Sequence, residues 1–408
     1  MLQSQLFPKT RKEAPKDAES VNHKLLVRAG FIDQLMAGSW TLLPLGWRVV
    51  VKINQIIREE MNAIGGQEML MPLLHPSSVW KETGRWEKAK EIMYQFEMNG
   101  KEYGLAFTHE EIVLDLLRKN IKSYSDLPLA VYHFSTKFRD EARPKSGILR
   151  GREFMMKDLY SAHVSEEDLM DYYDIVKGAY VKIFDRLGFN YKVTEASGGV
   201  FTDKHTHEFQ VLCPNGEDFI YYCDKCDWSY NKEIFEGKAG DACPVCGKGK
   251  VVEAKAIEVG NIFPLGTWLS ERMKIYYTDK EGKKRIVWFG SYGIGPTRVM
   301  GTIAEVSRDE HGLIWPSQVA PFNVHLIELP GSKNTKEIYK HLIDGGVDVL
   351  WDDRGVGTGE KFADCDLIGI PVRLVVSEKT GDKIEWKERT SNETVLLTIE
   401  EVLQKLRA

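Results

Sequence analysis

Apolar residues recur at helical spacing near the start of the chain. In residues 45–64, LGWRVVVKINQIIREEMNAI, the apolar positions Val49, Ile53, Ile57 and Met61 lie four residues apart. This spacing predicts a helix with one buried face. Gly65-Gly66 is expected to end the helix, and the run EMLMPLLHP that follows is expected to be extended and to stop at a proline.

Two further runs predict strands, and a third predicts a helix. Residues 128–139, PLAVYHFSTKFR, and residues 152–158, REFMMKD, flank a loop rich in Arg, Pro, Lys and Gly. Residues 165–187 have apolar positions at helical spacing, and Ser165 with the two glutamates after it supplies an N-cap and favourable charge. Strands and turns are expected from 191 to 295, and another helix is expected to begin near Gly295.

The pattern changes at residues 315–329, WPSQVAPFNVHLIEL, where two prolines indicate a linker. After them, NVHLIEL, a helix near 334–344, VDVLWDD, a helix near 359–367 and PVRLVVS alternate as β-α-β-α-β. This alternation predicts a small parallel-sheet domain. The chain is therefore expected to form two domains, with a small cysteine-bearing element inside the first.

Composition narrows the class of protein. The 408 residues are 43% hydrophobic and 28% charged, which is ordinary for a globular protein and argues against disorder or a fibrous repeat. No stretch approaches the roughly 18 apolar residues needed to cross a bilayer, and the basic N-terminus lacks the apolar core of a secretory signal. We therefore expect a cytoplasmic protein without a membrane partner. The net charge of −5 argues against indiscriminate binding of nucleic acid, although local patches remain compatible with RNA contact.

Four of the six cysteines form a regular array. Cys223, Cys226, Cys243 and Cys246 make two C-x-x-C pairs separated by 16 residues, which is typical of a structural zinc ribbon. Four thiolate ligands would leave no open position for catalysis. The alternative is a pair of loops whose metal has been lost. Cys213 and Cys365 stand apart and are expected to pack as small apolar residues.

Two stretches suggest a nucleotide site. In FRDEARPKSGILRGREF, residues 138–154, Arg139 and Glu141 lie two apart on the predicted strand and are expected to point to one face, with Phe154 on the return strand as a stacking surface. Taken alone, this stretch would favour a cross-strand salt bridge on a solvated sheet face. In GSYGIGPTRVM, residues 290–300, a glycine-rich turn allows close approach of a ligand and Arg298 follows at the start of a helix.

These stretches resemble motifs 2 and 3 of class II aminoacyl-tRNA synthetases, and the helix–glycine–strand run ending at Pro72 resembles motif 1. Further stretches are similar to prolyl-tRNA synthetases of the bacterial type. They are LLVRAGFIDQLMAGSWTLLPLGWRV, SSVWKETGRW, FTHEEIVLDLLRKN, KAIEVGNIFPLGT and the C-terminal WDDRGVGTGEKFADCDLIGIPVRLVV. The resemblance covers nearly the whole chain in order.

The resemblance implies an enzyme that joins L-proline to tRNA(Pro) through a prolyl-adenylate, using ATP and Mg²⁺. Arg139 and Arg298 would be the catalytic residues, with Arg139 on the α-phosphate and the substrate carboxylate and Arg298 on the γ-phosphate. The remaining ligand contacts implied are, for proline, Thr108, Glu110, His163, His207 and Ser291, and, for ATP and its metal, Glu141, Phe154 and Glu258. For either histidine alone, a structural role would be the commoner explanation.

The resemblance also implies a fold class and domain bounds. The fold is expected to be α/β, with an α+β catalytic domain over residues 1–318, built on a class II antiparallel sheet with helices, and an α/β anticodon-binding domain over residues 319–408. Motifs 1, 2 and 3 would lie at about 45–72, 138–158 and 290–305. The tRNA contacts implied are Arg143 and Lys145 in the motif 2 loop and Asp353, Arg354 and Lys361 in the anticodon-binding domain. A homodimer formed through motif 1 is a further implication.

One family feature is missing. Bacterial-type relatives usually carry a large insertion that hydrolyses alanyl-tRNA(Pro), and here the four-cysteine element at 219–250 stands in its place. We therefore expect no editing in cis and measurable mischarging with alanine, because lost methylene contacts discriminate by only about 1 to 3 kcal/mol. A separate trans-editing protein remains open as a partner. The chain also departs from the family at Ser291, where many relatives have Cys, and at residues 199–205.

Two alternatives remain at this point. The first is a synthetase of the same class for another amino acid such as threonine, although threonyl enzymes use histidine-containing zinc sites in the pocket. The second is a synthetase-like regulatory or interaction protein without activity. Such proteins tend to lose the motif arginines or the anticodon domain, and here Arg139, Arg298 and the C-terminal domain are all present.

Overall fold

The structure is a computed structural model that describes residues 1–142, 144–198 and 206–407. The chain divides into two compact units. The larger unit contains residues 36–39 and 54–302, and the smaller contains residues 1–35, 40–53 and 303–408. The N-terminal segments thus belong to the same unit as the C-terminal part, which the sequence pattern did not indicate.

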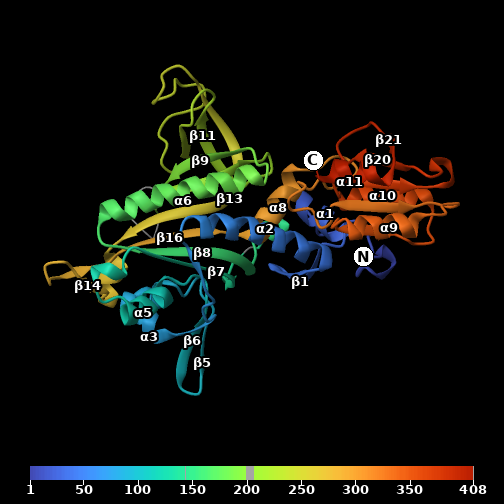
Figure 1. The fold of residues 1–408 in the computed structure, drawn as a ribbon. Helices are drawn as coiled ribbons and strands as arrows, with labels where there is room; N and C mark the ends of the chain where they lie inside the picture. Colours follow the sequence, from blue (N-terminus) through green and yellow to red (C-terminus); the bar gives the residue numbers. More distant parts are fainter. Residues whose placement is uncertain (143, 199–205, 408) are drawn as a thin grey trace. The chain divides into compact units, whose positions relative to one another are not determined.

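A nine-stranded sheet organises the larger unit (Figure 1). All its neighbouring pairs are antiparallel except β12 with β9 and β3 with β7. β13 also pairs with β10, so five of the strands form a closed ring of pairings at one end of the sheet. The strand order is β10 (Thr206–Leu212), β9 (Tyr191–Ala196), β12 (Ser229–Asn231), β11 (Asp218–Cys223), β13 (Val251–Gly266), β16 (Trp288–Ile294), β8 (Glu153–His163), β7 (Leu129–Phe138) and β3 (Gln67–Glu68).

Helix α6 (Glu166–Arg186) lies across β8, β16 and β13 (Figure 1). Ser165 caps it by accepting a hydrogen bond from the Asp168 N–H, as the sequence predicts. Its buried face includes Tyr173, Tyr180 and Phe184. The predicted strands at 128–139 and 152–158 and the predicted helix at 165–187 are confirmed, with β8 extending further than expected to His163.

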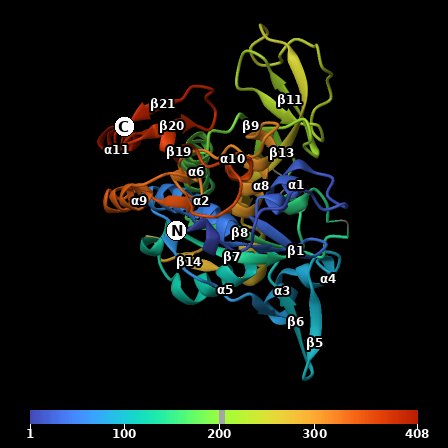
Figure 2. The same cartoon turned by 90° about the vertical axis from the view of Figure 1, so that its right-hand side faces the viewer.

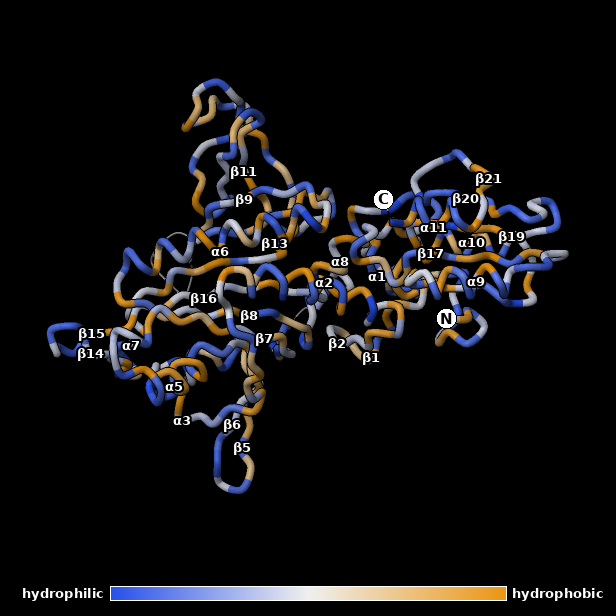
Figure 3. The backbone as a smooth tube through the Cα atoms, viewed as in Figure 1, coloured by the Kyte–Doolittle hydropathy of each residue, from blue (hydrophilic) through white to orange (hydrophobic). Residues whose placement is uncertain are grey.

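The other elements of the larger unit surround this sheet. A three-stranded sheet of order β4-β6-β5 packs near α3 and α5, and an apolar core joins α5, α7, β14 and β16. In Figure 3 the tips of the β5–β6 and β14–β15 hairpins are hydrophilic. The elements are β4 (Leu74–Pro76), α3 (Ser77–Thr83), α4 (Arg85–Lys88), β5 (Gln95–Met98), β6 (Lys101–Leu105), α5 (Glu110–Asn120), η2 (Tyr124–Asp126), η3 (Gly147–Leu149), α7 (Trp268–Met273), β14 (Tyr276–Thr278) and β15 (Lys284–Ile286).

The smaller unit contains a five-stranded sheet of order β18-β17-β19-β20-β21. Its first three strands are parallel and the last two pairings are antiparallel, and its apolar core lies between the strands and the helices α9 and α11. The predicted β-α-β-α-β order is confirmed. The elements are β17 (Val324–Glu328), α9 (Thr335–Asp344), β18 (Val349–Asp352), α10 (Thr358–Ile368), β19 (Val372–Val376), η4 (Glu378–Thr380), β20 (Ile384–Glu388), β21 (Val395–Leu397) and α11 (Ile399–Arg407).

The N-terminal segment joins this smaller sheet. Leu2 forms a parallel bridge with Trp351 at the edge of β18, and η1 (Gln3–Gln5), α1 (Val21–Arg28), β1 (Ile32–Met36) and β2 (Ser39–Leu42) follow.

The helices α2 (Pro44–Ala63) and α8 (Pro296–Val306) match the predicted helices at 45–64 and from Gly295. Among the described residues, no helix is both long and apolar enough to cross a membrane.

Candidate active site

A cavity of about 480 Å³ lies over β8, β13 and β16 in the larger unit. Antiparallel pairing of β7 with β8, β8 with β16 and β16 with β13 brings together segments that are far apart in the sequence. The residues singled out from the sequence that line it are Thr108, Glu110, Arg139, Glu141, Phe154, Glu258, Ser291 and Arg298. Gly293 also lines it, and a Cβ there would meet no atom closer than Met156 Sδ at 3.8 Å.

One part of the cavity presents a buried carboxylate. Glu110 is the first residue of α5 and is 3% exposed. Thr108 Oγ1 donates to its Oε2 over 2.6 Å, and Ser291 Oγ donates to its Oε1 over 3.1 Å. The helix N-terminus further favours a negative charge at this position. A carboxylate held in this way fits an ammonium group of a ligand.

A buried guanidinium lies along the same cavity. Arg139 stands over the ring of Phe154, with 5.2 Å from its Cζ to the ring centroid. Its Nε has no hydrogen-bond partner within the described part of the chain. Burial and the nearby charge of Arg298 lower the pKa of Arg139. A guanidinium with unused donors fits an anionic ligand such as a carboxylate or a phosphate.

The expectation that Arg139 and Glu141 lie on one strand is wrong. β7 ends at Phe138, and although the Arg139 N–H still donates to Arg152 O over 2.9 Å, the Glu141 N–H turns back to Arg139 O over 2.7 Å. Both side chains line the cavity because of this tight turn, and not because of strand alternation.

Arg298, in the first turn of α8, is fixed by backbone oxygens. Its Nε donates to Leu149 O over 2.9 Å and its Nη1 to Glu258 O over 3.1 Å, with Glu258 Oε2 at 3.3 Å. The guanidinium therefore keeps its position without a full bidentate ion pair. About one third of the side chain is exposed, which leaves it accessible from the cavity.

The loop after β7 is tied to the cavity rim by acidic residues. Arg150 Nε donates to Glu141 Oε2 over 2.7 Å, and Arg150 Nη1 lies 3.4 Å from Glu217 Oε2. Lys145 Nζ lies 3.6 Å from Glu217 Oε1, with its side chain 60% exposed. Arg143, the other predicted tRNA contact of this loop, lies outside the described residues.

The two histidines expected near proline do not line the cavity. His163 is buried at the end of β8, with Nε2 2.8 Å from Ser161 Oγ and Nδ1 3.3 Å from Asp168 Oδ2. His207 Nδ1 lies 2.7 Å from the Tyr173 hydroxyl. Residues 199–205, just before His207, lie outside the described part of the chain.

Beneath the carboxylate end lies a buried charge network. Asp158 contacts Lys137 Nζ over 2.8 Å and His133 Nε2 over 3.1 Å, and accepts from the Tyr160 hydroxyl over 2.8 Å. His109, His133 and Asp158 stand as close together as metal ligands do. The Lys137 ammonium already supplies the positive charge there, so these residues do not fit a metal ion. Burial lowers the pKa of His109 to about 2, so this imidazole is neutral.

Two carboxylates lie near Arg298. Glu208 accepts hydrogen bonds from Gln210 Nε2 over 2.8 Å and Asn231 Nδ2 over 2.9 Å, while Asn261 Nδ2 donates to Glu258 Oε1 over 3.1 Å. Burial and repulsion from Glu258 raise the pKa of Glu208 to about 8. A cation between these two carboxylates would relieve their mutual repulsion, and carboxylate oxygens are the ligands that Mg²⁺ prefers.

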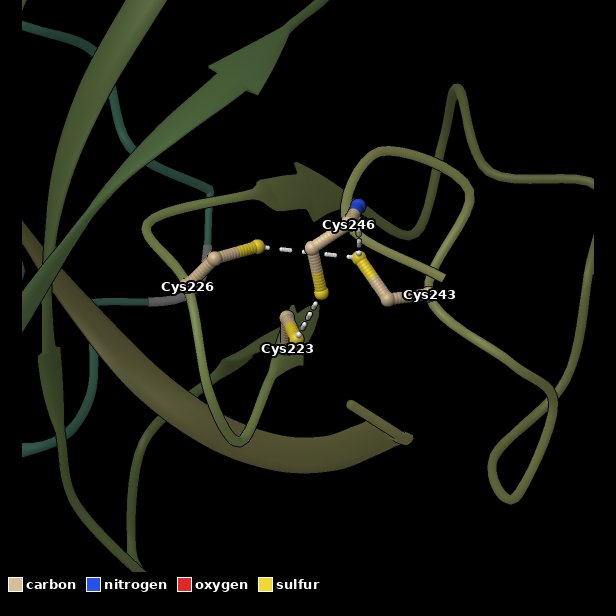
Figure 4. A group of neighbouring side chains, drawn as sticks. All are labelled: Cys223, Cys226, Cys243 and Cys246. Carbon is tan, nitrogen blue, oxygen red and sulfur yellow. Dashed lines mark hydrogen bonds between the residues drawn. The ribbon is translucent and has the colours of Figure 1, made fainter. Parts of the chain in front are cut away.

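The four cysteines converge between β11 and β13, and their sulfurs point toward one another (Figure 4). In Figures 1 and 2 this part of the chain extends beyond the rest of the sheet. The Sγ atoms of Cys223 and Cys246 are 3.7 Å apart, as are those of Cys226 and Cys243. A disulfide needs about 2.05 Å, whereas a tetrahedron with zinc–sulfur bonds of about 2.3 Å needs about 3.8 Å between sulfurs. The set therefore fits zinc.

Comparisons with known proteins show the family to which the chain belongs. Residues 94–307 match the family described as tRNA synthetase class II core domain (G, H, P, S and T), and residues 319–408 match the family described as anticodon binding domain. The proline–tRNA ligase of Agrobacterium fabrum is 38% identical over 99% of both chains, and that of Persephonella marina is 35% identical over 98% of this chain and 99% of its own. The chain belongs to the prolyl-tRNA synthetase family.

A solved structure supports the same fold. The Giardia lamblia prolyl-tRNA synthetase, determined in complex with prolyl-adenylate, superimposes with a TM-score of 0.78 at 20% identity, over 94% of this chain and 75% of that one. The predicted fold class is thereby confirmed as a class II synthetase core with an α/β anticodon-binding domain. The relatives named above are proline–tRNA ligases, which disfavours the threonyl alternative.

In the anticodon-binding domain of this family member, the three predicted tRNA contacts are already engaged. Arg354 donates to Asp352 over 2.7 Å and to Asp364 over 2.7 Å. Lys361 is 3% exposed and donates to the carbonyl oxygens of Glu328 and Asp352. Asp353 accepts from Ser4, at 2.9 Å from its N–H and 2.6 Å from its hydroxyl.

Sequence reasoning missed several residues of the synthetase site. Arg85 Nη1 contacts Glu110 over 3.3 Å and the neighbouring Glu111 over 3.1 Å. The adjacent acids at 110 and 111 were the available signal, because two acidic side chains at a buried helix start require a cation. No local signal marks Lys137 and Asp158, because they meet only through strand pairing. The lining residues Glu208, Glu217 and Asn261 were also missed.

Proposed function

We propose that the protein activates L-proline with ATP and transfers the prolyl group to tRNA(Pro). The observation that carries this proposal is the polarity of the cavity: the carboxylate of Glu110 in one part, and the guanidinium groups of Arg139 and Arg298 elsewhere along it. Proline has a secondary ammonium and a carboxylate, and ATP brings phosphates. The cavity therefore offers an opposite charge to each charged group of both substrates.

In the first step, an oxygen of the proline carboxylate attacks the α-phosphorus of ATP. A new oxygen–phosphorus bond forms, the bond to the bridging oxygen breaks, and pyrophosphate leaves. No general base is needed, because the carboxylate is already ionised. Arg139 orients the carboxylate and the α-phosphate and Arg298 the γ-phosphate, so that catalysis comes from positioning and charge stabilisation. In the second step the terminal ribose hydroxyl of the tRNA attacks the activated carbonyl carbon and AMP leaves.

Other groups complete the substrate contacts in this proposal. Glu141 accepts from the adenine amino group and Phe154 stacks on the base. Thr108 and Ser291 keep Glu110 aimed at the ammonium. Mg²⁺, held by Glu258 and Glu208, would neutralise charge on the phosphates. Neither His163 nor His207 lines the cavity. We therefore propose that they support the residues around the proline site and do not bind proline directly.

The tRNA contacts are proposed at two places. In the loop after β7 they are Lys145 and Arg143, of which Lys145 is largely exposed. In the anticodon-binding domain they belong to the segment containing Asp353, Arg354 and Lys361. We assign catalysis to residues 1–318 and anticodon binding to residues 319–408. We also place the enzyme in the cytoplasm, where aminoacyl-tRNA is used.

We further propose a structural zinc ion on Cys223, Cys226, Cys243 and Cys246. The backbone N–H groups of Lys225, Cys246 and Gly249 donate to cysteine sulfurs of this set. Such hydrogen bonds stabilise thiolates. The ion would add to the apolar contacts of Tyr221, Trp228 and Phe235, which pack beside the cysteines. Metal analysis of untagged protein should find about one zinc per chain. A Cys226→Ser, Cys243→Ser variant should contain none, and zinc-free wild-type protein would contradict the assignment.

We propose that editing in cis is absent. The alignment with the Persephonella marina enzyme runs over 558 positions, whereas this chain has 408 residues, so at least 150 positions have no counterpart here. Purified enzyme given alanyl-tRNA(Pro) should leave it intact, and alanine should be attached to tRNA(Pro) at a measurable rate. Rapid deacylation would overturn this. In the cell, a separate trans-editing protein would then hydrolyse the alanyl-tRNA(Pro).

A homodimer through motif 1 is also proposed. Leu70 and Leu74, in the extended run that ends motif 1, are 81% and 50% exposed. Large exposed apolar side chains in such a run favour a protein interface. Sedimentation at micromolar concentration should give twice the chain mass, and a monomer would contradict the assignment.

The decisive test of the activity is exchange of labelled pyrophosphate into ATP. Exchange that depends on proline supports the proposal. Exchange that depends on threonine would select the other class II activity, and no exchange with any amino acid would indicate a protein that retains the fold without the reaction.

A further inference from the structure

Two adjacent buried glutamates begin α5, and only the first of them reaches the cavity. Glu110 lines the cavity, whereas Glu111 does not and is fully buried. Two neighbouring buried carboxylates repel each other and are costly to ionise unless a cation lies beside them. Arg85, at the start of α4, supplies that cation from a side chain that is only 12% exposed.

The guanidinium of Arg85 is shared unequally. Its Nη1 lies 3.1 Å from both oxygens of Glu111 and 3.3 Å from Oε2 of Glu110. Thr83 Oγ1 donates to Glu111 over 2.9 Å and so fixes that carboxylate. The rings of Trp80 and Phe107, with centroids 5.3 and 5.5 Å from the guanidinium carbon, hold Arg85 in place. Glu111 is therefore the main partner of Arg85.

This unequal sharing has a consequence for the substrate. A bidentate pair between Arg85 and Glu110 would satisfy both carboxylate oxygens and leave none for an ammonium group. Complete loss of Arg85 would leave Glu110 with two hydroxyl donors and without its ion-pair partner. The observed arrangement avoids both extremes.

We propose that Arg85 and Glu111 are positioning residues for proline: Arg85 offsets part of the buried negative charge at the start of α5, and Glu111 holds Arg85 back so that Glu110 stays free to bind the proline ammonium. The inference rests on the proposed function, because it takes Glu110 as the ammonium acceptor. It adds a specificity device outside the cavity, built from two residues that never touch the substrate.

The charges balance in this arrangement. Glu110, Glu111 and Arg85 together carry one net negative charge, which the single positive charge of the ammonium neutralises. Burial raises the pKa of Glu111 to about 7 against the opposing effect of Arg85, and Glu110 raises it further. Lys137 and Arg139 are the other cations that act on Glu110. Protonation of Glu111 would release Arg85 toward Glu110.

The test compares KM values in proline-dependent pyrophosphate exchange. Glu111→Gln should raise the KM for proline roughly 10-fold, because Arg85 then turns to Glu110, while the KM for ATP and kcat change less than about twofold. Arg85→Gln should raise the KM for proline roughly 100-fold, since Glu110 loses its cation. The double variant Arg85→Gln, Glu111→Gln should be less impaired than Arg85→Gln alone, because one uncompensated buried carboxylate is removed.

The pH dependence of the KM for proline distinguishes a positioning role from a merely structural one, because a structural role would not change it. In the wild type the KM for proline should rise as pH falls below about 7, since Glu111 becomes protonated. In Glu111→Gln this rise should be absent and the KM should stay high at all pH values. Arg118→Gln is the matched control, because Arg118 joins α5 to Glu82 on the surface, away from the cavity. It should behave as the wild type.

The outcomes separate the two proposals. If the wild type shows no proline-dependent exchange, the proposed function fails. If the wild type is active but the variants change the KM for proline and for ATP equally, or Glu111→Gln keeps the wild-type KM and pH profile, only the positioning role is overturned.

Discussion

Charged residues are used differently in the cavity of the catalytic unit and in the segment 352–364 of the anticodon-binding domain. In the cavity, Glu110 is buried and Arg139 is partly buried, yet both keep hydrogen-bonding capacity toward a ligand. In the segment, Lys361 is buried and the Arg354 side chain is 10% exposed, and both spend their donors on Asp352, Asp364 and backbone oxygens. The same residue types thus prepare a binding site in one place and tie a fold together in the other. Availability of the donors, and not the presence of charge, separates the two uses.

The largest expected effect comes from Arg139→Gln. Proline-dependent pyrophosphate exchange should fall about 1,000-fold, because a cation that stabilises charge in the transition state is lost. Thermal stability should stay the same or rise, since burial of this guanidinium is costly and lowers its pKa. Calorimetry together with the exchange assay checks both parts. A large loss of stability would show that Arg139 is a structural residue and would break the comparison.

Arg354→Met should lower stability and leave pyrophosphate exchange unchanged, which is the reverse of the result expected for Arg139→Gln. Its guanidinium donates to both oxygens of Asp352 and to Asp364, so its removal takes the nearest cation from both acids. We expect a loss of about 3 kcal/mol in the stability of the smaller unit. Pyrophosphate exchange, which needs no tRNA, should be nearly unchanged. Denaturant unfolding measures the first quantity. Unchanged stability with weaker tRNA binding would instead make Arg354 a direct tRNA contact.

Acid should weaken the smaller unit through His325. Burial lowers the pKa of this imidazole from 6.5 to about 4, and its Nε2 lies 2.7 Å from Gln3 Oε1. The folded state therefore resists protonation that the unfolded state accepts, so the stability that neutral His325 contributes is present above pH 6.5 and is lost as pH falls toward 4. The loss should reach about 2 kcal/mol by pH 5. His325→Gln should show a flatter dependence in unfolding experiments at several pH values, and an equal slope would contradict this origin.

The smallest effect is expected from Ser4→Ala. Its hydroxyl donates to Asp353 at the protein surface, so stability should fall by about 1 kcal/mol or less. Asp353 then keeps the bond from the backbone N–H of residue 4 but has one carboxylate oxygen released, which should change the KM for tRNA(Pro) without changing the KM for proline. Charging assays with both substrates varied in turn provide the measurement. Identical KM values for tRNA(Pro) in both proteins would mark Asp353 as an anchor for the N-terminal segment only.

Much of the fold could be predicted from local patterns. The helix at 165–187, its Ser165 cap and the β-α-β-α-β order of the C-terminal part depend on spacing and capping within a few residues, and these are confirmed. The placement of Arg139 and Glu141 on one strand was wrong, because the return of the Glu141 N–H to Arg139 O ends the strand at Phe138. That bond depends on a loop whose course is fixed by contacts with Ile92 and Arg152, which lie elsewhere in the chain.

The sequence by itself determined the chemistry of this protein: the motif arginines, the carboxylate at Glu110, the two C-x-x-C pairs and the order of domains. Only the tertiary structure decided which charges remain available. Arg85 and Glu111 meet across helices α4 and α5, and Arg354 is enclosed by Asp352 and Asp364. The physical reason is that periodicity and capping act between neighbours in the chain, whereas burial and ion pairing depend on segments that fold together from distant positions.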